Sequence, residues 1–284
     1  MYIDGDFVPN LILRPKTKLS SMRKLAIGTW RTTYDPSVYG SMSLRMDKTL
    51  AYLEDFRKKK NRKLTLSHIL AKVMGMVLHE MPDANAILRF NRIYLRQDIG
   101  VFFQVAMQDP QTGELDLSGM VIRDTHTKSL VEIYDEFSER VEKVRSYKDE
   151  NLEETRSIIK SLPHFLLHPF VDMLGFLSYT LNWDLSKLGI PKDALGSVMI
   201  TNVGSLGLEE AYVPLVPYSR VPLLLALGKV RDEAVVIDKK IEILPMMRIF
   251  ATFDHRLLDG AHAAKMSKLV TEYIENPYTY FDEI

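Results

Sequence analysis

The chain has 284 residues, 46% of them hydrophobic and 26% charged, which is typical of a folded protein with a substantial core. Its 37 basic and 37 acidic residues balance, and this argues against a dedicated nucleic-acid-binding protein. The chain has no cysteine, which excludes disulfides, thiolate metal sites and cysteine nucleophiles.

The first third of the chain predicts mainly helices. Apolar residues recur at helical spacing in three stretches, and one stretch alternates as a strand does. Pro82 supplies a stop for the longest helix, because proline has no backbone N–H and clashes with the preceding turn. We therefore expect a strand at 38–46 and helices at 19–30, at 48–60 and from a cap at Thr65 or Ser67 to residue 81.

The remainder predicts a mixed α/β fold. Strand patterns occupy residues 86–95, 99–107, 115–123, 197–202, 222–230, 235–237 and 240–252, and helical patterns occupy 129–147 and 260–275. Residues 151–190 have the pattern of a mostly helical insertion. Because the elements follow no strict βαβ order, we expect a two-layer α/β sandwich with a mixed sheet. No repeat or linker divides the chain, so we expect one domain over residues 1–284.

A histidine lies between a hydrophobic strand and an amphipathic helix, in the sequence FDHRLLDG at 253–260. A histidine can accept and return a proton near neutral pH, which makes His255 a candidate general base. Asp259 can order the loop by pairing with an arginine or with backbone N–H groups. Gly260 allows a close approach or a positive φ where the helix begins. A single strand-end histidine is more often structural, and these neighbours favour the catalytic interpretation.

A second candidate segment is SVMITNVGSLG at 197–207, where an apolar strand runs into a hydroxyl, an amide and two glycines. The Thr201 hydroxyl is a candidate donor to the oxyanion of a tetrahedral intermediate. The alternative is a strand followed by a glycine turn without chemistry. Ser205 does not stand in the Gly-x-Ser-x-Gly sequence of a nucleophile elbow, which disfavours a serine hydrolase.

Together these segments resemble the catalytic domain of the acyltransferase component of 2-oxoacid dehydrogenase complexes, dihydrolipoamide acyltransferase. This family belongs to the chloramphenicol acetyltransferase-like superfamily. The similarity runs in order through Met22-Arg23-Lys24, residues 64–67, the Pro-x-x-Asn-Ala sequence at 82–86, Asp98-Ile99-Gly100-Val101, Thr201-Asn202-Val203-Gly204 and the HxxxDG sequence at 255–260.

The resemblance implies a chloramphenicol acetyltransferase-like fold and an acyltransferase activity. His255 would take the proton from a thiol of coenzyme A or dihydrolipoamide, and the thiolate would attack an acyl thioester. Thr201 would donate to the oxyanion. Asp259 would be structural, paired with an arginine such as Arg23. The residues expected beside coenzyme A are Asn202, Gly204 and Gly260.

The resemblance also implies partners. The family's site lies between subunits of a trimer, so we expect a homotrimer and, within a larger complex, a higher assembly. Coenzyme A or acyl-coenzyme A would be the co-substrate, and no metal is needed. The family's lipoyl and subunit-binding domains have no counterpart in this sequence. The acyl group would therefore come directly from acyl-coenzyme A, or from a lipoylated or acyl-carrier protein acting in trans.

Residues 151–190 depart from the family. Within them, the segment 162–183 contains one acid, Asp172, no lysine or arginine, and many apolar residues, and it is long enough to span a bilayer. Pro163 and Pro169 argue against a span, so we expect a helix pair packed on the domain or at a subunit contact. Contact with a membrane surface, or a pocket for an acyl chain, is the less favoured alternative. The first six residues are acidic rather than basic and precede no apolar run, so we expect a cytoplasmic protein.

Two alternatives to an acyltransferase remain open. The chain could be a scaffold or assembly subunit that kept the fold and lost turnover, or a hydrolase in which water replaces the acceptor. Binding of coenzyme A distinguishes an acyltransferase from a scaffold. Product analysis with and without an acceptor distinguishes an acyltransferase from a hydrolase.

Overall fold

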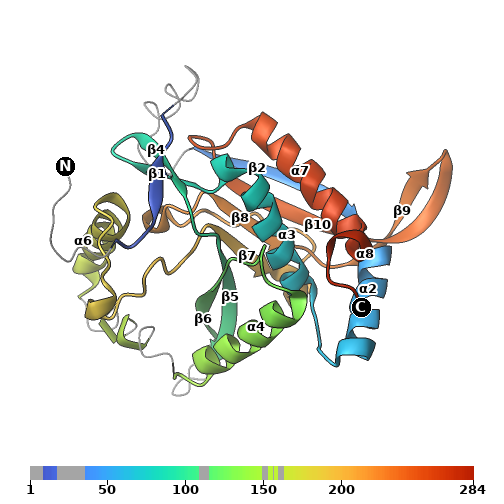
Figure 1. The fold of residues 1–284 in the computed structure, drawn as a ribbon, viewed down its shortest axis with the longest axis horizontal. Helices are drawn as coiled ribbons and strands as arrows, with labels where there is room; N and C mark the ends of the chain where they lie inside the picture. Colours follow the sequence, from blue (N-terminus) through green and yellow to red (C-terminus); the bar gives the residue numbers. More distant parts are fainter. Residues whose placement is uncertain (1–8, 18–35, 109–114, 149–152, 156, 159–162) are drawn as a thin grey trace.

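The computed structural model describes residues 9–17, 36–108, 115–148, 153–155, 157–158 and 163–284. The helix expected at 19–30, which includes Arg23, lies outside these residues. The described part is built on a seven-stranded sheet with the order β2-β10-β8-β7-β5-β6, in which β9 pairs with β10 (Figure 1). Its strands are β2 (Ser37–Arg45), β5 (Gly100–Gln108), β6 (Leu115–Arg123), β7 (Val198–Asn202), β8 (Leu223–Leu227), β9 (Arg231–Ile237) and β10 (Lys240–Asp254).

The sheet is mixed, as the sequence predicts. Strands β5, β7 and β8 run parallel to one another. Strand β10 runs antiparallel to its neighbours β2, β8 and β9, and β6 runs antiparallel to β5. The C-terminal ends of β7 and β10 therefore point toward opposite edges of the sheet, and this separation decides how the candidate site is built.

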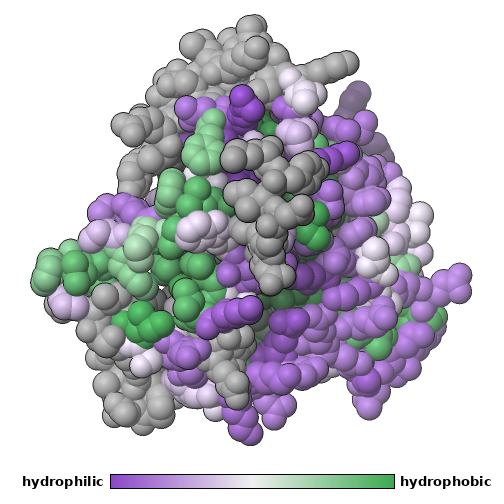
Figure 2. Space-filling model, turned by 60° about the vertical axis from the view of Figure 1, so that its left-hand side comes forward, coloured by the Kyte–Doolittle hydropathy of each residue, from purple (hydrophilic) through white to green (hydrophobic). Residues whose placement is uncertain are grey.

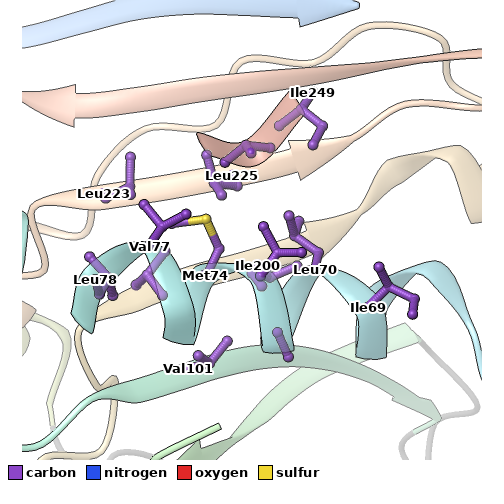
Figure 3. Packing of buried hydrophobic residues seen from close by; sticks show 14 of the residues in the cluster. Ile69, Leu70, Met74, Val77, Leu78, Val101, Ile200, Leu223, Leu225 and Ile249 are labelled. Atoms are coloured by element: carbon purple, nitrogen blue, oxygen red, sulfur yellow. The ribbon is translucent and has the colours of Figure 1, made fainter. Parts of the chain in front are cut away.

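Helices cover one face of the sheet (Figure 1). Helix α3 packs its apolar stripe directly on the central strands, because its apolar residues recur three and four positions apart. Figure 3 shows this contact, which joins Ile69, Leu70, Met74 and Val77 of α3 to Val101, Ile200, Leu225 and Ile249. The helices of the described residues include α2 (Asp47–Lys60), α3 (Leu66–Glu80), α4 (Leu130–Arg145), α7 (Gly260–Glu275) and α8 (Pro277–Tyr280).

Two N-terminal caps explain where helices begin. Thr65 and His68 form a capping box at the start of α3, and Ser129 and Glu132 form another at the start of α4. In the α4 box the Ser129 hydroxyl accepts a hydrogen bond from the Glu132 backbone N–H at 3.2 Å. These contacts confirm Thr65 as the cap that the sequence offered alongside Ser67.

The prediction of a single strand at 86–95 is wrong. The structure has two strands there, β3 (Ala86–Arg89) and β4 (Arg92–Arg96), which pair with each other and with β1 (Leu13–Pro15) in a separate three-stranded sheet. The turn places Phe90 and Asn91 at φ values of 48° and 61°. A two-residue hairpin turn of type I′ needs positive φ at both positions and usually carries glycine, and the sequence has none there.

The segment between α4 and β7 contains a helix, α6 (His164–Gly175), which continues into a π-helical turn at Phe176–Thr180. A short 3₁₀ helix follows at Ser186–Leu188. Within the described residues, no helix combines the length and apolar character needed to cross a bilayer.

Candidate active site

His255 follows β10 directly and is half-buried. Its backbone N–H donates to the carbonyl of Pro36 at 2.8 Å. Its ring Nδ1 lies 2.8 Å from the carbonyl oxygen of Leu258, and a carbonyl can only accept. Nδ1 therefore carries a proton in this arrangement, and in the neutral ring Nε2 carries the lone pair. That is the tautomer in which an imidazole can take a proton from a thiol.

An ion pair supports the turn on both sides of His255. The Arg256 guanidinium donates to both carboxylate oxygens of Asp254, with Nη2 2.6 Å from Oδ2. Both side chains are almost fully buried, at 6% and 4% exposed. The Asp254 backbone carbonyl also accepts from the N–H groups of Leu257 and Leu258. The Asp254–Arg256 pair therefore closes the turn that carries the His255 ring.

Asp259 is the N-cap of α7. Its Oδ1 accepts from the backbone N–H groups of Ala261 and His262 at 3.0 and 3.1 Å, and it lies 2.7 Å from the His262 ring Nδ1. A carboxylate here also complements the positive end of the helix dipole. Of the two partners that the sequence offered, backbone N–H groups are observed. The suggested pairing with Arg23 lies outside the described residues.

The conformational role expected for Gly260 is wrong. Gly260 does not have a positive φ, and a Cβ built on it would meet nothing within 4 Å. The position therefore tolerates a side chain as far as the described chain is concerned. Gly204 is different, because a Cβ there would lie 2.5 Å from the carbonyl oxygen of Gly228. Close packing of two backbone segments requires glycine at 204.

Thr201 lies near the end of β7, beside Gln104 of β5. Its hydroxyl donates to the Gln104 side-chain Oε1 at 3.1 Å. The next residue, Asn202, caps the following 3₁₀ turn by accepting from the N–H of Ser205 at 3.0 Å, and its Nδ2 donates to the Ser67 hydroxyl at 3.4 Å. The end of β7 is thus held by side-chain contacts with two other elements, β5 and α3.

The structure does not bring His255 and Thr201 together within one chain. Thr201 pairs with Ala226 near the C-terminal end of β8, whereas Phe253 pairs with Leu223 at its N-terminal end. His255 lies two residues beyond that last pair. At about 3.3 Å per residue, the two positions are roughly 17 Å apart along the strand direction. Each chain therefore places its candidate base at one edge of the sheet and its candidate hydroxyl donor at the other.

Sequence reasoning missed three residues of these two half-sites. Asp254 and Arg256 flank the histidine in the sequence, and that pair of opposite charges was a usable signal. Gln104 carries no such signal, because it meets Thr201 only through the pairing of β5 with β7. Among the described residues, no cluster of three or more histidine, aspartate or glutamate side chains is arranged to hold a metal ion.

Comparison with known proteins identifies relatives of the whole domain. The family model described as 2-oxoacid dehydrogenases acyltransferase (catalytic domain) matches residues 15–159 and 188–281. The succinyltransferase component of the 2-oxoglutarate dehydrogenase complex from Sus scrofa is 27% identical over 240 residues, which cover 83% of this chain and 42% of that protein. The chain spans less than half the length of the curated relatives that it matches.

Two solved structures share the fold. The dihydrolipoamide acetyltransferase of Azotobacter vinelandii has a TM-score of 0.64 at 20% identity, over 92% of this chain and 88% of that chain. The cubic core of a pyruvate dehydrogenase multienzyme complex has a TM-score of 0.64 at 21% identity, over 93% of each chain. The two-layer fold with a mixed sheet is thus confirmed both by the topology of the strands and by these structures.

Proposed function

The chain belongs to the 2-oxoacid dehydrogenase acyltransferase family through its catalytic domain, and from that premise we propose that it is an acyltransferase. It moves an acyl group between a thioester of coenzyme A or a lipoyl group and an acceptor thiol, hydroxyl or amine. The observation that carries this proposal is the contact of His255 Nδ1 with the Leu258 carbonyl, which in the neutral ring makes Nε2 the nitrogen that takes a proton.

In the proposed reaction, Nε2 of His255 removes the proton from the acceptor thiol. The thiolate attacks the carbonyl carbon of the thioester, and the carbonyl oxygen becomes an oxyanion. Collapse of this intermediate breaks the original carbon–sulfur bond, and the departing thiolate takes the proton back from His255. A positioned base typically contributes about 10²–10⁴-fold to such a step. No step needs a metal.

Thr201 is the proposed oxyanion donor. Crystallographic and enzymatic work on the Azotobacter vinelandii enzyme concerns the role of a serine, a histidine and an asparagine in its catalytic mechanism, the last two four positions apart. His255 and Asp259 have the same spacing here. To donate to an oxyanion, the Thr201 hydroxyl must turn away from Gln104. Loss of one such donor typically costs about 3–4 kcal/mol of transition-state stabilisation.

The site is proposed to form between copies of the chain, because each copy holds its base and its hydroxyl at opposite edges of the sheet. A contact between unlike edges is head-to-tail, and head-to-tail contacts generate a ring when the rotation between copies closes. The trimer that the resemblance implies satisfies this requirement. The same fold in a cubic core supports a proposed higher assembly. A lipoylated or acyl-carrier protein remains the proposed partner where acyl-coenzyme A is not the donor.

Substitution of His255 tests the activity. With a panel of acyl-coenzyme A donors and dihydrolipoamide as acceptor, we expect His255→Ala to lower kcat about 10³-fold, since the base is lost. We expect the matched variant of an exposed histidine, His79→Ala, to keep wild-type kcat. Unchanged thermal unfolding and sedimentation of His255→Ala would show that the fold and the assembly persist. Wild-type kcat in that variant would refute the mechanism.

The same assay distinguishes the two alternatives. Release of free coenzyme A at equal rates with and without an acceptor would identify a hydrolase. Absence of coenzyme A binding in a stable oligomer would identify a scaffold. We expect neither result. We propose that Asn202, Gly204 and Gly260 line the coenzyme A site, and that catalysis takes place in the cytoplasm.

A further inference from the structure

Helix α6 exposes apolar side chains that a lone surface helix would bury. Its solvent-facing stripe, here the α6 patch, comprises Phe165, Leu166, Met173 and Phe176, which are 78%, 39%, 48% and 45% exposed. Figure 2 shows hydrophobic residues gathered on the face that α6 occupies. The apolar face of a surface helix is normally packed against the rest of the protein. The family model passes over this segment, leaving residues 160–187 unmatched.

The α6 patch belongs to the end of the molecule that carries His255. Gly175 at the end of α6 lies against Tyr218, whose carbonyl oxygen would be 3.0 Å from an added Cβ. Burial and the charge of Arg256 lower the pKa of Arg220, and the charge of Asp172 in α6 opposes this shift. The chain then reaches Pro222, whose carbonyl accepts from the Asp254 N–H at 2.9 Å. Helix α6 thus flanks the base.

A second uncovered apolar surface lies at the Thr201 end. Strand β9 and the start of β10 form a hairpin that projects beyond the sheet (Figure 1). Val236 pairs with Ile241, and Ile243 follows on the same face, so the three side chains form one surface, here the hairpin patch. They are 73%, 77% and 75% exposed. A two-stranded hairpin is at best marginally stable in water unless it packs against something.

The hairpin patch is tied to the segment that follows Thr201. The hairpin begins just after β8, where the Gly228 N–H donates to the carbonyl of Arg248 at 2.9 Å. The Arg248 guanidinium in turn donates to Glu210 at 2.7 Å. The two uncovered patches therefore lie at opposite ends of the molecule, α6 on one side of Figure 1 and β9 on the other.

We propose that the α6 patch of one copy receives the hairpin patch of the next copy. The inference rests on the proposed function, because the same contact would carry the His255 end of one copy toward the Thr201 end of its neighbour. The two patches are unlike, so the contact is head-to-tail and repeats until the ring closes. Residues 163–183 contain no lysine or arginine, whereas helices that lie on membrane surfaces are rich in them. A zero net charge also removes overall repulsion between copies.

Cross-linking tests the contact directly, since a chain without cysteine gives no background. Met173→Cys and Ile243→Cys, made singly and mixed, should join with a short bismaleimide into covalent dimers of the two variants. The double variant should join into larger multimers. Met173→Cys mixed with Leu50→Cys, an exposed α2 position, is the matched control and should not join. Equal joining of Met173→Cys to itself would indicate a two-fold contact and would overturn the proposal.

Polar substitutions give a second test. Phe165→Ser with Met173→Ser, and separately Ile241→Ser with Ile243→Ser, should each raise the dissociation constant of the oligomer at least about 30-fold. Turnover per chain should fall in parallel on dilution and recover at high chain concentration. Wild-type assembly in both variants would overturn the inference and leave the acyltransferase proposal intact. If the α6 variant instead lost binding to phosphatidylcholine–phosphatidylglycerol vesicles while assembly was unchanged, α6 would belong to a membrane surface, which would also overturn the inference.

The two proposals fail in different ways. If the cross-links form but no donor on the panel gives His255-dependent turnover, the function is wrong and the contact stands. If turnover depends on His255 but the cross-links do not form, the contact is wrong and the function stands.

Discussion

His255 lies between Asp254 and Arg256, two charged residues that bond to each other. Neither charge touches the proposed chemistry, yet their contact shapes the turn that presents the ring. Breaking a buried ion pair by removing one partner typically costs about 3–5 kcal/mol, because the other charge is left without compensation. The turn that carries the proposed base therefore depends on two residues that take no part in the proposed proton transfer.

Replacement of the buried arginine tests this dependence. We expect Arg256→Ala to lower the free energy of unfolding by about 3–5 kcal/mol. The matched change at an exposed ion pair, Arg140→Ala opposite Glu136, should cost less than about 1 kcal/mol. Urea unfolding at one fixed chain concentration measures both, since assembly contributes to apparent stability. Equal small losses in the two variants would show that the Asp254–Arg256 pair does not hold the turn.

The sequence predicts the candidate site residues whose signal is local, and only those. His255 and Asp259 stand four positions apart in one motif, and the geometry of Asp259 follows from its place before a helix. Gln104 meets Thr201 across a gap of 97 residues, through the pairing of two parallel strands. No pattern within either strand encodes that meeting.

Elements with strong periodicity agree closely with their predicted bounds. Helix α7 has the expected bounds, because Asp259 caps its start and the proline of Asn276-Pro277 follows its end. Strand β7 begins one residue after its expected start. The prediction fails at 86–95 because the turn residues, Phe90 and Asn91, adopt positive φ although neither is glycine, the residue that usually indicates such a turn in a sequence. Helices are less sensitive to one such residue, since their signal extends over several turns.

Helices α3 and α4 meet around a buried histidine. His68 is 3% exposed, and its ring lies 4.4 Å from that of Phe137 in α4. Its Nδ1 accepts from the N–H of Thr65 at 3.0 Å, which completes the cap of α3. Burial lowers the pKa of His68 to about 4. The contact between α3 and α4 is therefore built for a neutral ring.

Acid should weaken this contact. Because the folded-state pKa lies below the ordinary histidine value, the unfolded chain binds the proton first as pH falls. The contribution of neutral His68 to the free energy of unfolding is fully present at pH 7 and is lost as pH falls from about 6.5 toward 4. The His68 share of that loss between pH 7 and pH 5 should be about 2 kcal/mol.

Unfolding of His68→Gln at the two pH values checks this share. Glutamine keeps an acceptor for Thr65 but cannot be charged, so the variant should lose about 2 kcal/mol less than wild type between pH 7 and pH 5. His168→Gln, at an exposed position of α6, is the matched control and should behave as wild type. An acid response of His68→Gln equal to that of wild type would contradict the account.

The whole molecule separates the two halves of the proposed site. Strands β7 and β10 flank β8 and run in opposite directions, so Thr201 and His255 end at opposite edges of one sheet. Motifs in the sequence predict both residues, but the distance between them depends on strand order, which no motif contains. A monomer with this topology is incomplete for the proposed chemistry, so the proposal makes assembly part of the mechanism.

Mixed assembly of two inactive variants tests this claim most directly. His255→Ala chains keep Thr201, and Thr201→Val chains keep His255, so each variant alone lacks one half of every site. Co-expressed and assembled at random, they should recover about a quarter of wild-type activity per chain, because about one interface in four joins the two intact halves. The same variants purified separately and mixed without exchange should show no gain. Failure of the co-assembled chains to exceed the variants alone would contradict a site shared between copies.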